Sequence, residues 1–106
     1  MPPPIHEIIT GNIRAIEQLC RQHSVRELCA FGSVITDHFD PQHSDVDIMA
    51  DFYSPEAPGI ADRFMALAIG LETIFQRPVD LVTKSAIKNP VFRRIVEQNS
   101  QPIYAG

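Results

Sequence analysis

The segment 45–52, which reads DVDIMADF, constrains the fold of this chain more than any other stretch. Alternation along a β-strand would place Asp45, Asp47 and Met49 on one face, with apolar residues on the other. Because the strand is so apolar apart from its acids, we expect it to lie centrally in a sheet, with its acidic face lining a cleft. The apolar face must then be covered by other elements, which favours a sheet with helices packed on it.

The spacing of apolar residues predicts the elements that complete this sheet. Residues 5–20 and 60–75 show the three- and four-residue spacing of amphipathic helices. Residues 25–31 and 79–82 read as short strands, and residues 36–44 as a polar loop. The chain is therefore expected to alternate between helices that pack on the sheet and strands that form it.

A last helix is predicted to begin at Asn89 and Pro90, which are a good N-cap and a good first helical residue. Residues 102–104 would add an edge strand. The sequence thus predicts one α/β (α+β) domain over residues 1–106, a small mixed β-sheet flanked by helices, with residues 1–4 extended and frayed. The apolar face of the last helix would consist of Val91, Phe92, Ile95 and Val96.

Composition narrows the class of protein. The 106 residues, 44% of them apolar and 21% charged, suffice for one soluble domain with its own core. A net charge of -4 disfavours direct binding of nucleic acid or of anionic membranes. No stretch approaches the roughly 20 apolar residues of a membrane span, and the N-terminus lacks signal-peptide features. Cys20 and Cys29 form no ligand motif, so we interpret them as buried thiols in a cytoplasmic protein.

The acids of the central strand suggest a metal site. Asp45 and Asp47 would lie about 6.5–7 Å apart at the backbone, and a divalent cation such as Mg²⁺ offsets the repulsion between such neighbours. A D-x-D pair alone is weak evidence, but Asp80 lies in another apolar strand and completes a triad if the two strands pair. Three carboxylates can hold two metal ions about 3.5–4 Å apart, which suits phosphoryl-type transfer. The alternative for Asp80 is an ion pair with Arg77 or Lys84.

A glycine and a serine, Gly32 and Ser33, follow directly on the first predicted strand. Glycine lets the backbone approach a ligand closely, and serine can cap a helix start whose free N–H groups attract anions. This corner is therefore a candidate for binding nucleotide phosphates. By itself the pair is more simply explained as a tight turn with a capping serine.

These pieces together resemble the minimal nucleotidyltransferase (MNT) family of the polymerase-beta-like superfamily. The resemblance covers nearly the whole chain, and the combined pattern is more specific than any of its parts. The segments that carry it are GS at 32–33, SDVD at 44–47, DF at 51–52, PVDLVT at 78–83, NPVFRR at 89–94 and PIYA at 102–105.

The resemblance implies the nucleotidyltransferase fold, ATP as substrate and two Mg²⁺ ions. It implies that Asp45, Asp47 and Asp80 are the catalytic metal ligands and that Gly32 and Ser33 contact the nucleotide. Many small members resemble antitoxins that bind a HEPN-domain toxin, and some transfer AMP to a toxin tyrosine. The implied function is therefore protein adenylylation by an antitoxin, in a homodimer or a hetero-oligomer.

Two features depart from the family pattern. The spacer 34–44 is one residue longer than the commonest form, and no basic residue follows Gly32 and Ser33 closely. A non-catalytic antitoxin that acts by contact alone therefore stays open, as does a small-molecule nucleotidyltransferase working with a separate helical subunit. Because no residues remain for a second domain, we expect a partner protein to bring the acceptor, docking on residues 52–58 or on the last helix.

Overall fold

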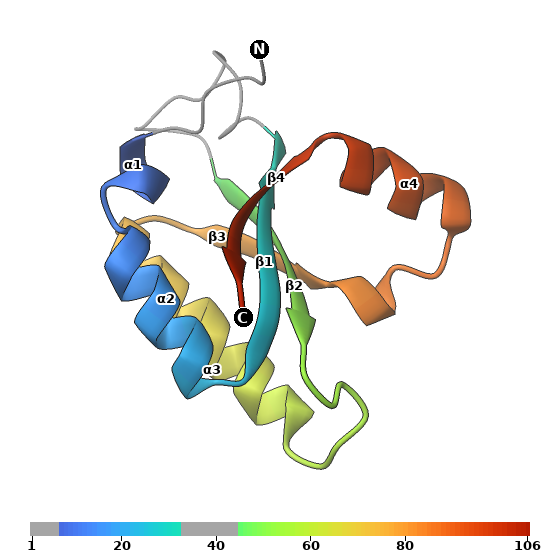
Figure 1. Cartoon of the computed structure of the whole chain (residues 1–106), viewed down its shortest axis with the longest axis horizontal. Coiled ribbons are helices and arrows are strands. Elements are labelled where there is room, and N and C mark those ends of the chain that lie inside the picture. Colours follow the sequence, from blue (N-terminus) through green and yellow to red (C-terminus); the bar gives the residue numbers. More distant parts are fainter. Residues whose placement is uncertain (1–6, 33–44) are drawn as a thin grey trace.

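The structure is a computed structural model that describes residues 7–32 and 45–106, and it contains one four-stranded mixed sheet (Figure 1). The strand order is β3-β2-β1-β4, with β3 parallel to β2 and the other pairs antiparallel. The small mixed sheet predicted from the sequence is thereby confirmed. In chain order the elements are α1 (Glu7–Thr10), α2 (Ile13–Gln22), β1 (Val25–Phe31), β2 (Val46–Phe52), α3 (Ile60–Phe75), β3 (Val79–Thr83), the 3-10 helix η2 (Lys84–Ala86), α4 (Pro90–Gln98) and β4 (Ser100–Ala105).

The sheet has two unequal sides. Helices α2 and α3 cover one face, and α4 stands on the other (Figure 1). The main core fills the space between the sheet and α2 and α3, and the largest completely buried side chains belong to it. They include Ile9, Ile16, Leu28, Ile48, Leu67, Leu71 and Phe75. A smaller cluster of Cys29, Met49, Ile87 and Val96 lies on the α4 side.

Strand β2 occupies the central position that its composition predicts. Val46, Ile48 and Ala50 are fully buried in the main core, whereas Met49 belongs to the cluster on the other face. Asp47 shares the face of Met49 and is half-buried. The acids of this strand therefore lie on the side of the sheet that α2 and α3 leave open.

The N-terminal segment forms two helices where the apolar spacing predicts one. The break falls at Gly11 and Asn12, and the Asn12 side chain donates a hydrogen bond to the carbonyl of Ile8 (2.7 Å). Glycine weakens a helix, and an asparagine side chain competes for backbone groups, so these two residues end α1. Among the helices that the structure describes, none is both long and apolar enough to span a membrane.

The start of α4 lies where the sequence predicts it, but most of the predicted apolar face is not buried. The Asn89 side chain caps the helix by accepting hydrogen bonds from the amides of Val91 (2.9 Å) and Phe92 (3.1 Å). Of the four residues predicted to form the apolar face, only Val96 is buried. Val91, Phe92 and Ile95 are 67%, 53% and 52% exposed, because α4 touches the sheet along only one side of that face.

The two cysteines are buried and unpaired, as expected from the sequence. Burial raises the pKa of both Cys20 and Cys29 to about 12, with a further contribution from Glu17 to the first and from Glu27 to the second. Both thiols are therefore neutral at pH 7 and are not nucleophiles. We assign them to packing.

Candidate active site

Strand pairing brings Asp47 and Asp80 side by side. Strands β2 and β3 run parallel, with Asp47 opposite Asp80 in the register. The amide of Val46 donates to the carbonyl of Pro78 (3.2 Å), which ties the beginnings of the two strands together. Asp45 directly precedes β2, two residues before Asp47 and on the same face. The fold thus gathers the three acids singled out in the sequence at one end of the sheet.

The environment of Asp47 disfavours an isolated negative charge. Its pKa is raised above the ordinary value, first by burial, then by the charges of Asp80 and Asp45, and by a side-chain hydrogen bond with Asp80. Asp45 and Asp80 are themselves exposed. Within residues 7–32 and 45–106, no three acidic, imidazole or thiol side chains converge into a ready-made cation site. The donor set nevertheless fits a divalent cation, since its charge would offset this repulsion.

Gly32 makes room for the Asp47 side chain. Strand β1 ends at Phe31, which pairs with Asp47, and Gly32 follows with a φ of +73°. A Cβ atom at this position would overlap Oδ2 of Asp47 and lie 3.1 Å from its Cγ. Glycine is therefore favoured here by backbone conformation, and it leaves the Asp47 carboxylate in its present position. Ser33, the other half of the predicted phosphate corner, lies outside the described residues.

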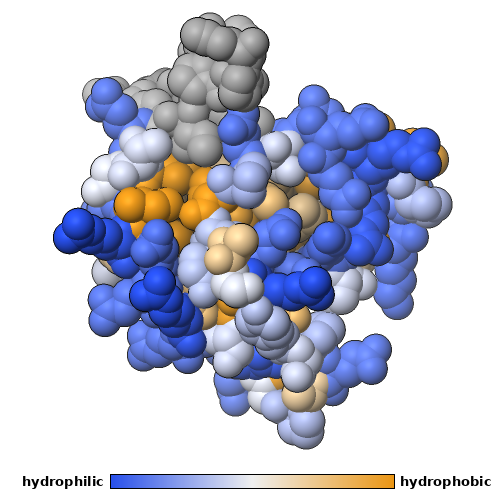
Figure 2. All heavy atoms as spheres, in the orientation of Figure 1, coloured by the Kyte–Doolittle hydropathy of each residue, from blue (hydrophilic) through white to orange (hydrophobic). Residues whose placement is uncertain are grey.

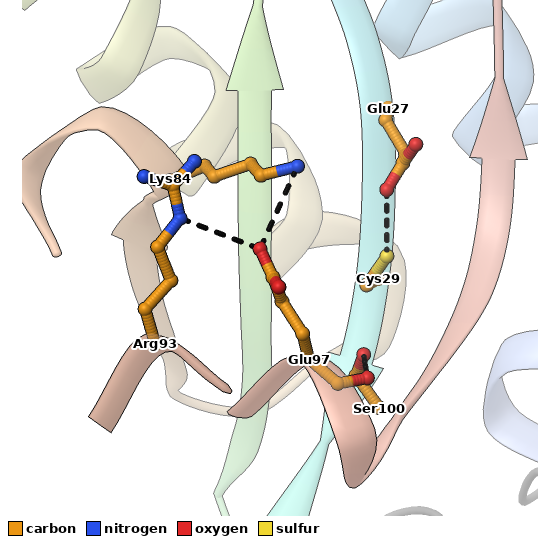
Figure 3. A network of polar contacts seen from close by, with 6 residues as sticks. All are labelled: Glu27, Cys29, Lys84, Arg93, Glu97 and Ser100. Atoms are coloured by element: carbon orange, nitrogen blue, oxygen red, sulfur yellow. Dashed lines mark hydrogen bonds and ion pairs between the residues drawn. The ribbon is translucent and has the colours of Figure 1, made fainter. Parts of the chain in front are cut away.

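The basic residue Lys84, one alternative partner of Asp80, is engaged elsewhere. Its Nζ atom lies 3.7 Å from Oε1 of Glu97 in α4 (Figure 3). The other alternative, Arg77, donates a hydrogen bond from Nε to the carbonyl of Phe75 (3.4 Å). Lys84 therefore helps to join η2 to α4.

A cavity that the sequence does not reveal lies on the acidic side of the sheet. Its volume is about 340 Å³, and its walls come from β1, β2, η2, α4 and β4. Met49, in its wall, follows Asp47 by two residues on the same face of β2, so the cavity opens on the same side of the sheet as the acids. The lining includes Glu27, Cys29, Lys84, Glu97 and Ser100. No sequence spacing could predict it, because five separate elements contribute one or two residues each.

A larger cavity of about 520 Å³ lies between α3 and the segment from β3 to η2. Its lining is almost entirely apolar and contains none of the three acids. Size alone would favour this cavity as a ligand site, but Thr83 is its one polar lining residue, and it offers no charged group for phosphate chemistry. We therefore place the candidate active site at the three acids, on the side of the sheet that also carries the smaller cavity, whose lining likewise includes none of them.

The repulsion at Asp47 leads to a prediction for the metal-free protein. A raised pKa means that the folded state binds this proton more tightly than the unfolded state, so stability falls as pH rises through the unfolded and then the folded pKa. At pH 7, Asp47→Asn should therefore raise stability in EDTA, visible as a higher Tm, because it removes the charge that burial and the neighbouring acids disfavour. Thermal unfolding measures this, and added Mg²⁺ should then raise the Tm of the parent more than that of the variant. A variant less stable than the parent in EDTA would contradict the prediction.

Sequence comparison identifies related proteins. A family model described as a nucleotidyltransferase domain matches residues 13–103. The chain is 31% identical over 94 residues to the protein adenylyltransferase MntA of Thermococcus cleftensis, an alignment that covers 89% of this chain and 88% of that protein. Both matches include all three acids.

Three solved structures share the fold. A structure assigned to the minimal nucleotidyltransferases superposes with a TM-score of 0.76 at 24% identity, covering 91% of this chain and 93% of the other. A complex of a tri-AMPylated Shewanella oneidensis HEPN toxin with an MNT antitoxin gives 0.63 at 20% identity, covering 92% and 73%. A toxin–antitoxin structure with AMP-PNP gives 0.63 at 22% identity, covering 90% and 74%. At these identities the likeness concerns the fold.

Proposed function

Since this chain belongs to the nucleotidyltransferase domain family, we propose that it is an antitoxin that transfers AMP from ATP to a tyrosine hydroxyl of a HEPN-domain toxin. The observation that carries the proposal is the parallel register that sets Asp47 beside Asp80, with Asp45 on the same face. The protein substrate is supported by the name of the Thermococcus relative, a protein adenylyltransferase, and by the AMPylated HEPN toxin in the Shewanella complex.

The acids have distinct roles in this proposal. Asp45, Asp47 and Asp80 would hold two Mg²⁺ ions, which supply positive charge to the triphosphate. Gly32, with Ser33, would contact the phosphates of ATP. The acceptor oxygen forms a bond to the α-phosphorus, the bond from that phosphorus to the pyrophosphate oxygen breaks, and pyrophosphate leaves. Asp80, exposed at the start of β3, accepts the proton of the acceptor hydroxyl.

The proposal is tested by incubating the purified chain with the HEPN-domain protein of the same organism, ATP and Mg²⁺. Intact-mass spectrometry should show the HEPN protein gaining one or more AMP groups, and peptide mapping should place them on tyrosine. EDTA should prevent the gain, and so should an ATP analogue with a methylene bridge between the α- and β-phosphorus atoms, because that bond cannot break. A tight complex with an unmodified HEPN protein would instead support an antitoxin that acts by contact alone, and a modified metabolite would support a small-molecule nucleotidyltransferase.

A further inference from the structure

Helix α4 exposes three apolar side chains in a row. Val91, Phe92 and Ile95 fall within an arc of about 100° on a regular helix, and each is more than half exposed. Val96, next to this arc, packs into the smaller cluster on the sheet. In Figure 2 the part of α4 turned toward the reader is hydrophilic, with apolar atoms only at its outer edge. We call Val91, Phe92 and Ile95 the α4 stripe, a surface that the described fold leaves uncovered.

The helix that carries the stripe is capped at its start and linked to η2 by one ion pair. Oε1 of Glu97 lies 3.7 Å from Nζ of Lys84 and 3.3 Å from Nε of Arg93 (Figure 3). The Ser100 hydroxyl donates a hydrogen bond to the carbonyl of Glu97 (3.1 Å), and Asn89 caps the other end. The stripe therefore lies on a helix that is connected to the rest of the fold through Glu97, Ser100 and the buried Val96.

The stripe has a basic border on a chain whose net charge is -4. Lys88 lies just before α4, and Arg94 lies on the side of the helix away from Val96; both are exposed. In the part of the chain that the structure describes, no ion pair engages either side chain. A complementary surface therefore combines apolar side chains with neighbouring Asp or Glu.

We infer that the α4 stripe, with Lys88 and Arg94 at its border, docks a segment of the toxin in which apolar residues are flanked by acidic ones. The inference rests on the proposed function, since it takes the docked protein to be the one that brings the acceptor hydroxyl. Position supports it, because Val96 packs with Met49, which follows Asp47 by two residues on the same face. A protein seated on α4 is therefore on the same side of the sheet as the acids.

Other exposed apolar residues do not combine an uncovered apolar surface with a basic border on the acidic side of the sheet. Met65 and Ile69 on α3 are 55% and 58% exposed, but α3 lies on the face of the sheet opposite the acids and carries Asp62 and Glu72. In the 52–58 segment, the hydroxyl of Tyr53 donates a hydrogen bond to the carbonyl of Gly106 (2.7 Å). The pair Met65 and Ile69 therefore offers a matched control of similar exposure.

The test compares a V91S/F92S/I95S variant with an M65S/I69S variant, each purified and titrated with the HEPN-domain protein of the same organism. We expect the first to raise the Kd at least about 100-fold and the second to change it less than about threefold. In transfer assays the first should raise KM for the HEPN protein and leave kcat at saturation unchanged, because docking is removed and the acids are not. A K88E/R94E variant should also weaken binding, with a smaller salt dependence than the parent.

The outcomes separate this inference from the proposed function. Mg²⁺-dependent ATP binding by each variant alone, measured by calorimetry, should equal that of the parent, which shows that the fold and the acids are intact. Parent-like affinity in the stripe variant, or unchanged binding after charge reversal, overturns the docking inference even when AMP transfer proceeds. If light scattering shows that the parent is a homodimer and the stripe variant a monomer, the stripe binds a second copy of this chain, and the inference that it binds the toxin is wrong. A stripe-dependent complex without AMP transfer overturns the enzymatic proposal and leaves the docking surface standing.

Discussion

Asp47→Asn should abolish AMP transfer, with kcat/KM reduced by at least about 10³-fold. Asp47 is the half-buried member of the acid group, with Asp45 two residues before it and Asp80 opposite it on the next strand. Asparagine has nearly the same shape but removes the charge that would hold a cation there. Initial rates of AMP incorporation into the HEPN protein, at several Mg²⁺ concentrations, measure the loss.

The control for this experiment lies on the same strand. Asp51 is also half-buried and points to the same face as Asp47, but it lies four residues farther along β2, roughly 13 Å away. Asp51→Asn should therefore keep transfer within about threefold of the parent. If Asp47→Asn retained a tenth of the parent activity, or if both substitutions reduced activity equally, Asp47 would not be a catalytic ligand.

The elements that could be predicted from the sequence are those whose pattern is local. Strand β2 is confirmed because apolar residues alternate with acids, and α3 because its apolar residues keep helical spacing over residues 60–75. The start of α4 is confirmed because an Asn-Pro pair specifies a capped helix through contacts within a few residues. Local patterns suffice wherever neighbouring residues determine the structure.

The features that could not be predicted depend on contacts between distant segments. The register that places Asp80 beside Asp47 joins residues more than thirty positions apart in the chain. From the sequence, one can say only that Asp80 completes the triad if its strand pairs with the strand of Asp47. Helix α4 has an amphipathic sequence, yet which part of its apolar face is buried depends on where the helix meets the sheet. The role of Gly32 as the space for a carboxylate also becomes visible only once β1 and β2 are paired.

Gly32→Ala should reduce AMP transfer by about 100-fold or more, although it removes no charged group. The new methyl group would overlap Oδ2 of Asp47, so the carboxylate must shift from its position opposite Asp80. A displacement of about 1 Å in a positioning group can cost on the order of 10²-fold in rate. The positive φ of +73° adds a stability cost of roughly 1–2 kcal/mol, visible as a lower Tm. Transfer rates and thermal unfolding of the same sample measure the two effects.

Gly59→Ala separates the backbone effect from the effect on Asp47. Gly59 also has a positive φ, +89°, but a Cβ atom there would meet nothing within 4 Å. It lies at the start of α3, far along the chain from the acids, so alanine should lower the Tm about as much as at Gly32 and leave transfer unchanged. Equal losses of activity in the two variants would mean that stability alone limits the enzyme. A loss confined to Gly32→Ala would show that the space left by this glycine keeps Asp47 in position for transfer.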